Sequence, residues 1–377
     1  MMKENHLHII SFDVPYPADY GGVIDVFYKL VALHQIGIKI HLHCFQYGRE
    51  EAKILESYCE DVKYYSRKTG LMANLSATPY IIKSRDNRQL IDNLCQNDYP
   101  ILCEGMHTCG ILLDKKLQSR KIVYRSSNIE HNYYQALAQK EKNSLRKLFF
   151  SFEYKKLKKW EQNLSRADLF LTVSEDDKAY YQTKFPRNMI ENIFSFFNQS
   201  TMTSPNFDNN EKYLLFHGNL SVHENASTAI FIINEIAPLI DYQVIIAGKN
   251  PSTNIVQAAT KQQNVKLTAN PSEEEMQKII GDAHINLLLT DQATGLKLKL
   301  LNSLYQGKFC LVNEMMLAGT GLHNCVEIAN STKEITTKIN ELMLMEFDEQ
   351  IYSARRQNIS IEFSNDYKAE KLVQFIF

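Results

Sequence analysis

The alternation of short apolar runs with longer helical patterns constrains the fold of this chain more than any other feature. The apolar run at 6–12 is followed by a helical pattern at 21–37 and then by a second apolar run at 38–45. Later runs include ILCEG, KIVYRSS and ADLFLTVS. Because strands that alternate with helices pair in parallel through crossover connections, the first half of the chain is predicted to form a parallel α/β sheet.

This alternation is interrupted once, between about 195 and 212. The segment is rich in Ser, Asn, Thr and Pro and has no periodicity, which is typical of a linker between domains. A second series of strand and helix patterns follows it and includes YLLFHG, YQVIIAGK, HINLLLT and KFCLVN. The sequence therefore predicts two doubly wound α/β domains in tandem.

Composition excludes several classes of protein. The 377-residue chain has a formal net charge of -1, which argues against a general nucleic-acid binder. Its seven cysteines form no C-x-x-C pair, and the spacing of His and Cys offers no zinc pattern. No apolar run approaches the roughly 20 residues that span a bilayer, and the first apolar stretch is too short for a secretory signal. We therefore expect a cytoplasmic protein without a nucleic-acid partner.

The loops after the predicted strands are the candidate ligand sites, because ligands of open parallel sheets bind beyond the carboxyl ends of the strands. The chain has neither a P-loop nor a G-x-G-x-x-G after a strand, which argues against P-loop NTPases and common dinucleotide oxidoreductases. In PADYGG, Gly21 and Gly22 open a helix. That turn is either a tight connection or a place where a ligand approaches the backbone.

A pair of lysines opens a predicted helix at 296–306. Lys297 and Lys299 lie in its first turn, where the helix dipole is positive and a cation typically costs ~0.3–1 kcal/mol. One explanation is a solvated lysine beside a lysine that lies along apolar surface. The other is that at least one lysine and the free amides of that turn bind a phosphate, with a nucleotide diphosphate as the anion.

Several segments resemble the retaining glycosyltransferases of the glycosyltransferase-B (GT-B) fold, family four in particular. PYPADYGG and GIKIHLHCF are similar to that family's opening turn and second strand, and FHGNLSVHEN and VIIAGKNP to the start of its donor domain. GLKLKLLNSLYQGKFCLVN is a G-x-K-x-K variant of its sugar-nucleotide helix, and AGTGL resembles the loop that follows. These motifs occur in the family's order over nearly the whole chain.

The resemblance implies two Rossmann-like domains whose parallel sheets face each other across a cleft. Residues 1–198 would bind the acceptor and 210–362 a nucleotide diphosphate sugar, with the C-terminal helix at 363–377 packing back on the first domain. The implied donor-binding residues are Gly21, Gly22, Gly218, Asn219, Lys249, Thr294, Gly295, Lys297, Lys299 and Asn302.

The chain departs from the family at the donor site. Many members carry two glutamates eight residues apart where this chain has Thr294 and Asn302. Asn302 can still hydrogen-bond a ribose hydroxyl, whereas Thr294 would contact the sugar differently. Asn219 and His223 stand where a basic pair is common, so the diphosphate charge would depend more heavily on the two lysines.

His107 matches the place of a histidine near the reacting centre in the family, and we expect it to be catalytic. The alternative is that His107 has a structural role beneath the end of a strand. Tyr20, Arg125, Asn128 and Glu130 are expected on the acceptor side. The last three can instead hold their loop by a salt bridge.

The stretch 140–166 carries nine basic residues against three acidic ones. The favoured interpretation is a solvated helix pair whose apolar side meets the domain core. The other is a basic patch that rests on anionic lipid, which suits a lipid-linked acceptor. The apolar side consists of Leu145, Phe149, Phe152, Trp160 and Leu164.

The sequence therefore predicts a retaining hexosyltransferase without metal or other cofactor. It would transfer a sugar from a nucleotide diphosphate sugar to a glycan or lipid-linked glycan during assembly of a bacterial surface polysaccharide. The basis for metal independence is the lack of a paired-carboxylate motif after any predicted strand. The alternatives are an epimerase or phosphorylase on the same fold, and a catalytically degenerate protein that binds nucleotide sugars.

Overall fold

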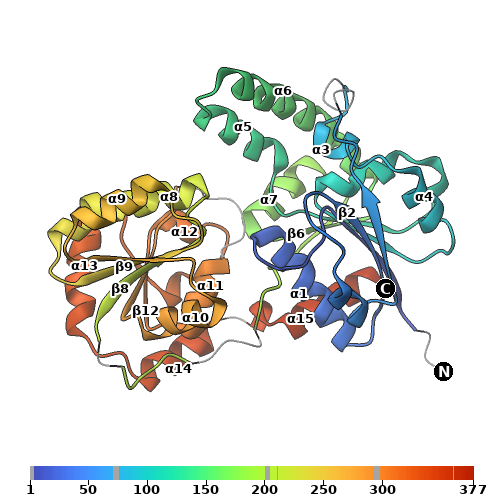
Figure 1. Ribbon diagram of the computed structural model, residues 1–377. Coiled ribbons are helices and arrows are strands. Elements are labelled where there is room, and N and C mark those ends of the chain that lie inside the picture. The colour runs from blue at the N-terminus through green and yellow to red at the C-terminus, as the bar shows by residue number, and fades with distance from the viewer. Residues whose placement is uncertain (1–3, 71–75, 200–203, 210, 292–297, 360) are drawn as a thin grey trace. The chain divides into compact units, whose positions relative to one another are not determined.

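The computed structural model describes residues 4–70, 76–199, 204–209, 211–291, 298–359 and 361–377. The chain forms two compact units (Figure 1). Unit 1 comprises Met1–Asn198 together with Ile361–Phe377, and unit 2 comprises Gln199–Ser360. Each unit contains one parallel sheet with helices on its faces, so the predicted α/β class with two parallel sheets is confirmed.

The sheet of unit 1 has seven parallel strands in the order β3-β2-β1-β4-β5-β6-β7. This order places β1 beside β4, where the direction of winding reverses and ligands of doubly wound sheets bind. The strands are β1 His6–Ser11, β2 Lys39–Gln46, β3 Asp61–Ser66, β4 Ile101–Glu104, β5 Ile122–Arg125, β6 Leu169–Thr172 and β7 Met189–Asn192.

Helices cover both faces of this sheet. Ile9 and Leu102 belong to a cluster with α1 and α15, whereas Ile10 and Cys103 pack with α3 and α4. Burial on both faces explains why the strands appear in the sequence as nearly continuous apolar runs. The helices of unit 1 are α1 Gly21–Gln35, α3 Tyr80–Lys83, α4 Arg88–Leu94, α5 Glu130–Lys140, α6 Ser144–Trp160, α7 Glu175–Lys184 and α15 Asn365–Ile376.

The segment after β7 belongs to unit 1, although the sequence places a linker from about 195. The backbone N–H of Phe196 donates to Asp25 at 2.7 Å, and Lys368 of α15 donates to the Ser195 carbonyl at 2.6 Å. Phe196 and Phe197 are buried. The linker prediction is therefore wrong over these first residues, because contacts from α1 and α15 hold a segment that looks irregular in the sequence.

The sheet of unit 2 has six parallel strands in the order β10-β9-β8-β11-β12-β13. Its winding reverses between β8 and β11, which again marks the ligand edge. The strands are β8 Tyr213–His217, β9 Gln243–Gly248, β10 Val265–Ala269, β11 Ile285–Leu288, β12 Phe309–Val312 and β13 Glu327–Ile328. The helices are α8 His223–Phe231, α9 Thr253–Lys261, α10 Glu273–Asp282, α11 Leu298–Gln306, α12 Glu314–Leu317, α13 Thr332–Leu344 and α14 Glu349–Asn358.

Helices α5 and α6 form a hairpin in unit 1 (Figure 1). Trp160 and Leu164 at its end are buried, but Leu145, Leu148 and Phe152 are 79%, 54% and 57% exposed. The interpretation that the apolar side meets the domain core is therefore wrong for Leu145 and Phe152, whereas Phe149 is half-buried against Tyr80. Among the described residues, no helix has the length and apolar character needed to cross a membrane.

Candidate functional site

The carboxyl edge of the unit 1 sheet contains His107, three residues beyond the end of β4. Gly105 has a φ of +69°, which allows the chain to turn from β4 into the 3-10 helix Met106–Leu113. A Cβ atom at Gly105 would lie 2.9 Å from His107 Nδ1. The tight turn thus places the imidazole directly over the end of the strand.

The His107 ring is partly exposed, but its Nδ1 is buried without a hydrogen-bond partner among the described residues. Nδ1 lies 3.7 Å from Glu130 Oε1, and the ring lies 5.3 Å from that of Phe12 between centroids. Burial lowers the pKa of His107 well below its usual value, and the charges of Arg85 and Arg67 lower it further. The imidazole is therefore neutral near pH 7 and can accept or donate a hydrogen bond.

Glu130 is buried in the first turn of α5. Burial raises the pKa of its carboxyl group to about 8, although the charge of Arg85 acts in the opposite direction. The carboxyl group is thus mainly protonated near neutral pH. His107 and Glu130 then form a neutral pair at the sheet edge rather than an ion pair, an arrangement suited to exchanging hydrogen bonds with a substrate hydroxyl.

Arg125 lies in the protein interior, in contact with Asp25 on α1. Its Nε and Nη2 lie 3.4 and 3.3 Å from the Asp25 carboxylate. Nη1 donates to the carbonyl of Thr172 at 3.0 Å and to that of Ile193, and Nη2 also donates to the carbonyl of Phe194. These five contacts engage all five guanidinium donors. They favour the alternative in which Arg125 holds the structure, and they correct the expectation that it faces the acceptor.

A buried ionic cluster surrounds this contact and was not predicted. Lys29 Nζ lies 2.6 Å from Glu104 Oε1 and 3.1 Å from Asp25 Oδ2. The cluster joins α1 to β4 and β5, and its charges are paired as burial requires. Its signal in the sequence is an Asp and a Lys four residues apart within an otherwise apolar helix.

The remaining acceptor-side residues lie at the same edge. The Tyr20 hydroxyl donates to Asp13 at 3.1 Å, and Arg49 lies over its ring at 5.1 Å. Gly21 and Gly22 open α1 directly after Tyr20. Asn128 is half-buried, and its Oδ1 has no hydrogen-bond partner among the described residues.

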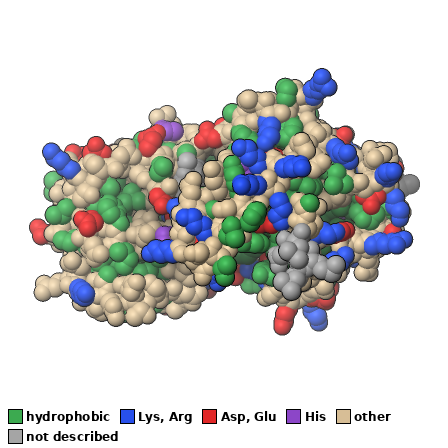
Figure 2. Space-filling view, turned by 90° about the horizontal axis from the view of Figure 1, so that it is seen from above, with side chains coloured by type: hydrophobic (Ala, Val, Ile, Leu, Met, Phe, Trp, Pro, Cys, Tyr) green, Lys and Arg blue, Asp and Glu red, His purple; other side chains and the backbone are tan. Residues whose placement is uncertain are grey.

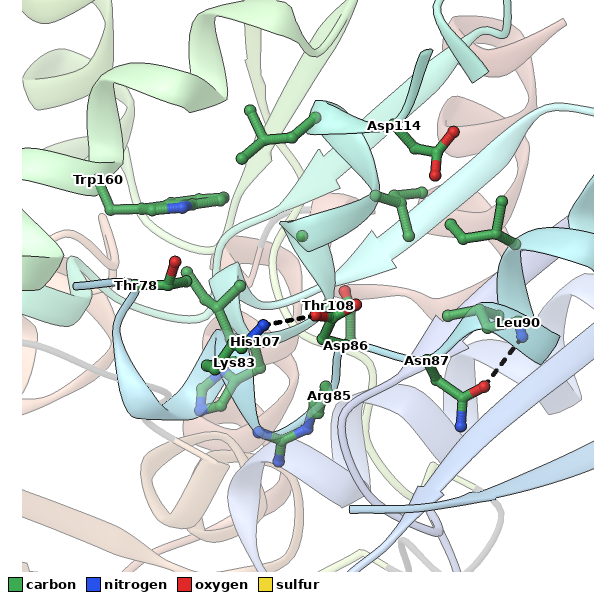
Figure 3. Close-up of a pocket in the computed structure, with 15 residues that line it drawn as sticks. Thr78, Lys83, Arg85, Asp86, Asn87, Leu90, His107, Thr108, Asp114 and Trp160 are labelled. Carbon is green, nitrogen blue, oxygen red and sulfur yellow. Dashed lines mark hydrogen bonds and ion pairs between the residues drawn. The ribbon is translucent and has the colours of Figure 1, made fainter. Parts of the chain in front are cut away.

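His107 also lines a pocket of about 270 Å³ (Figure 3). Arg85 from the segment after α3 and Trp160 from the end of α6 lie on its wall. The Trp160 Nε1 is buried without a hydrogen-bond partner among the described residues. The sequence reasoning did not assign a ligand to either residue, because Arg85 belongs to no strand-end motif and Trp160 was assigned to an apolar helix side.

At the carboxyl edge of the unit 2 sheet, the ends of β8 and β9 approach each other closely. A Cβ atom at Gly248 would lie 1.8 Å from the carbonyl oxygen of Gly218, so a side chain does not fit there. The Asn219 side chain accepts from Ser221, and the Asn219 carbonyl accepts from Asn225. These contacts shape a compact turn between β8 and the N-terminus of α8.

Lys299 of α11 reaches this turn. Its Nζ lies 3.3 Å from Asn225 Oδ1 and 5.4 Å from the centroid of the Phe216 ring. Burial lowers the pKa of Lys299, and the charge of Glu224 partly offsets the shift. A largely desolvated ammonium group next to a helix N-terminus is suited to a phosphate.

The other predicted donor residues are distributed around Lys299. Asn302 is half-buried one turn further along α11, and Lys249 is exposed after β9. Thr294, Gly295 and Lys297 lie outside the described residues. The structure therefore brings together Gly218, Asn219 and Lys299.

His217 at the end of β8 was not predicted as part of this edge. Its Nε2 lies 3.1 Å from Ser303 Oγ, and burial together with the charge of Lys299 lowers the pKa of His217 to about 3. Glu224 hydrogen-bonds to the Thr290 hydroxyl. Among the described residues, no group of three or more His, Cys, Asp or Glu side chains has an arrangement that fits a metal ion.

No family model matches the chain. A curated protein of Klebsiella pneumoniae, described as an uncharacterized 44.6 kDa protein in the cps region, is 25% identical over 350 residues, covering 87% of each chain. Sucrose-phosphate synthase from Thermosynechococcus elongatus has a TM-score of 0.70 at 13% identity, covering 99% of this chain and 98% of that chain. Anabaena HepE in complex with UDP and glucose has a TM-score of 0.66 at 12% identity, covering 99% of both chains.

These likenesses define the class of fold. The chain has the GT-B fold of glycosyltransferases, with one parallel sheet of seven strands and one of six. The two parallel α/β sheets that the sequence resemblance implies are thus confirmed.

Proposed function

We propose that this protein is a retaining, family-four-like glycosyltransferase that takes its sugar from a nucleotide diphosphate sugar. The observation that carries the proposal is the position of Lys299. It lies at the start of a helix, largely desolvated, next to the β8–α8 turn on the ligand edge of a GT-B sheet. The complex of HepE with UDP and glucose supports a nucleotide sugar as the partner.

Unit 2 is the proposed donor domain. Lys299, together with backbone amides near Gly218 and Asn219, binds the diphosphate, and Lys297 and Lys249 add positive charge. Asn302 hydrogen-bonds the ribose, and the family resemblance assigns Thr294 and Gly295 to the sugar. During transfer, the fixed ammonium group and helix amides stabilise the charge that develops on the leaving diphosphate, which is electrostatic catalysis.

Unit 1 is the proposed acceptor domain. Neutral His107 contacts the donor sugar or the attacking hydroxyl, and Glu130 orients it. Tyr20 and Asn128 lie at the same sheet edge, and Gly21 and Gly22 allow a ligand to approach the start of α1. In this proposal no metal or other cofactor takes part, because the lysines and helix amides supply the charge that a metal ion would contribute.

The proposed acceptor is a glycan or lipid-linked glycan of a bacterial surface polysaccharide. The Klebsiella relative in a cps region supports that assignment. The exposed Leu145, Leu148 and Phe152 support a peripheral contact between α6 and anionic lipid at the cytoplasmic face of the membrane. Lys and Arg side chains lie near hydrophobic ones on the face shown in Figure 2.

The experiment that tests this proposal is a thermal-shift screen of UDP-, GDP- and ADP-sugars, followed by a donor-hydrolysis assay with the best ligand. A ligand that binds only the native state raises its stability. We expect one nucleotide sugar to raise the melting temperature and to be hydrolysed slowly. Stabilisation without hydrolysis or transfer would instead favour a degenerate nucleotide-sugar-binding protein, and no stabilisation by any donor would refute the proposal.

A further inference from the structure

Two arginines that the proposed transfer does not use lie at the carboxyl edge of the unit 1 sheet. Arg67 directly follows β3, and Arg85 follows α3. Both act on His107, because the charges of both lower the pKa of that residue. Arg85 lines the same pocket as His107, and Arg67 contacts Ser84 directly before Arg85, so both arginines lie beside the proposed reacting centre.

The protein holds Arg85 in place without a carboxylate. Its Nε and Nη2 donate to the Phe12 carbonyl at 3.0 and 2.8 Å, and Nη1 donates to the Ile81 carbonyl at 2.6 Å. Three of the five donors are thus engaged by backbone oxygens, which leaves two for a ligand. The side chain is fixed, 8% exposed, and lines the pocket (Figure 3).

Arg67 is fixed in a similar way. Its Nε and Nη2 lie 3.3 and 3.0 Å from Ser84 Oγ, and its guanidinium stacks on Tyr47 at 4.2 Å. Neither Arg67 nor Arg85 forms an ion pair with any carboxylate of the described residues. The segments outside the described residues contain no Asp or Glu, so they have no side-chain carboxylate to offer.

This arrangement differs from the buried ionic cluster around Asp25 in unit 1. Arg125 and Lys29 are paired with Asp25 and Glu104, which offsets the cost of burying them. Burial lowers the pKa of Arg85 to about 9, the neighbouring charge of Arg67 contributes to this shift, and the charge of Asp13 acts in the opposite direction. Two fixed, neighbouring guanidinium groups, neither of which forms an ion pair with a carboxylate of the described residues, match the planar oxygens of a carboxylate or phosphate.

The carboxylates on the pocket wall do not neutralise the pair. Asp86 forms an ion pair with Lys83 at 2.7 Å, and Asp114 accepts the backbone N–H of Lys116 at 2.8 Å. Asp114 lies away from Arg85 in Figure 3. A volume of about 270 Å³ is slightly below that of pockets for drug-sized ligands, and it suits one sugar ring.

We propose that Arg67 and Arg85 bind an anionic group of the acceptor, a carboxylate or a phosphate, while the pocket beside His107 receives the sugar ring that carries it. The unpaired Trp160 Nε1 donates to a hydroxyl of that ring. This proposal rests on the proposed function, and it identifies the acceptor as an acidic glycan or a glycan next to a phosphate.

Trp160 is the single tryptophan of the chain, so its fluorescence reports directly on the pocket. The purified protein is titrated with methyl β-glucuronide, glucose 6-phosphate and, as the neutral match, methyl β-glucoside. We expect saturable changes with at least one anionic sugar and at least tenfold weaker binding of the neutral sugar. The stronger of the two anionic probes tells whether a carboxylate or a phosphate is the natural group.

The variants Arg67→Gln and Arg85→Lys are titrated beside Arg88→Gln. The control removes a positive charge from an exposed position on α4 close to the pocket. We expect Arg67→Gln to weaken the binding of anionic sugars at least tenfold. Arg85→Lys should also weaken this binding, because lysine lacks the forked geometry of the guanidinium group, whereas Arg88→Gln should bind them as the unmodified protein does. Equal binding of neutral and anionic sugars, no saturable binding of any probe, or unchanged binding by a folded Arg67→Gln variant would each overturn the proposal.

This test does not depend on transfer. Binding of anionic sugars without donor hydrolysis would leave the arginine site in place while refuting the proposed activity. Hydrolysis of a nucleotide sugar without preference for anionic sugars would support the proposed activity and refute the arginine site.

Discussion

Replacement of Lys299 by methionine should separate donor binding from stability. The methionine side chain is of similar length and can still lie over the Phe216 ring, but it removes the charge that we assign to the diphosphate. A hydrogen bond to a charged group contributes ~1.5–3 kcal/mol. At about 1.4 kcal/mol per factor of ten, the loss corresponds to about 10- to 150-fold weaker binding of the nucleoside diphosphate.

Stability should respond differently. Burial lowers the pKa of Lys299, which means that the folded environment disfavours its charge. An apolar group of similar size in that position should leave the melting temperature unchanged or raise it. The combination of weaker nucleotide binding with undiminished stability is what a ligand-binding role predicts.

The assay is isothermal titration calorimetry of the nucleoside diphosphate that stabilises the protein most, with the melting temperature measured on the same preparation. Lys333→Met is the control, because it removes an exposed lysine from the first turn of α13 in unit 2. Lys299→Met with the affinity of the unmodified protein and an intact fold would refute the phosphate role. A large loss of stability would show that Lys299 is structural.

Four further outcomes are expected. His107→Ala should reduce turnover far more than nucleotide affinity, because its contact is made mainly in the transition state; an equal loss of both, together with a lower melting temperature, would indicate a structural histidine. The usual pKa of Glu130 is 4.5, and burial raises it to about 8 in the folded protein, so between these values the native state holds a proton that the unfolded state has released. The free energy of unfolding should therefore fall as the pH rises through that window. At 1.36 kcal/mol per pKa unit, the fall is roughly 5 kcal/mol at most. Between pH 5 and pH 8.5 the melting temperature of Glu130→Gln should therefore fall less than that of the unmodified protein, and an equal fall would contradict the buried proton. Donor hydrolysis should persist in excess EDTA; activity abolished by EDTA and restored by magnesium or manganese would disprove metal independence. The double variant Leu148→Ser, Phe152→Ser should reduce sedimentation with anionic vesicles at least tenfold without changing nucleotide affinity, and unchanged sedimentation would remove α6 from the membrane contact.

The sheets were predictable because their strands are buried on both faces. The runs ILC and IVY are apolar throughout, and each begins a central strand, β4 or β5. The edge strands β3, β7 and β13 were missed. In β3 polar residues flank a valine and two tyrosines, β7 is the short run MIEN, and β13 has two residues, so none carries the continuous apolar signal.

The candidate site was predictable only where a residue directly follows a recognised strand. His107 and Asn219 were found by that rule, and the structure places both at the carboxyl edges. Arg67 was missed because β3 was missed, although it follows that strand directly. Arg85 could not be predicted from the sequence, since its position depends on the carbonyl of Phe12, which lies 73 residues earlier in the chain.

The prediction that Arg125 faces the acceptor was wrong for a physical reason. A strand-end arginine in the sequence looks available to a ligand, but its partner Asp25 lies 100 residues earlier and on α1. The pairing of two buried charges across that distance leaves no local signal. Conversely, the apolar residues of α6 follow a helical spacing that is typical of a buried side, yet Leu145, Leu148 and Phe152 are exposed.

The anomeric form of the sugar first released from the donor tests the central claim most directly. The purified protein is incubated with the nucleotide sugar that stabilises it most, and the first product is observed by proton NMR before mutarotation equalises the anomers. A retaining glycosyltransferase predicts that an α-linked donor releases the α-anomer first, at a rate that falls in Lys299→Met. Initial release of the β-anomer would contradict retention, and no release above the rate of the buffer alone, with or without acceptor, would contradict catalysis by this protein.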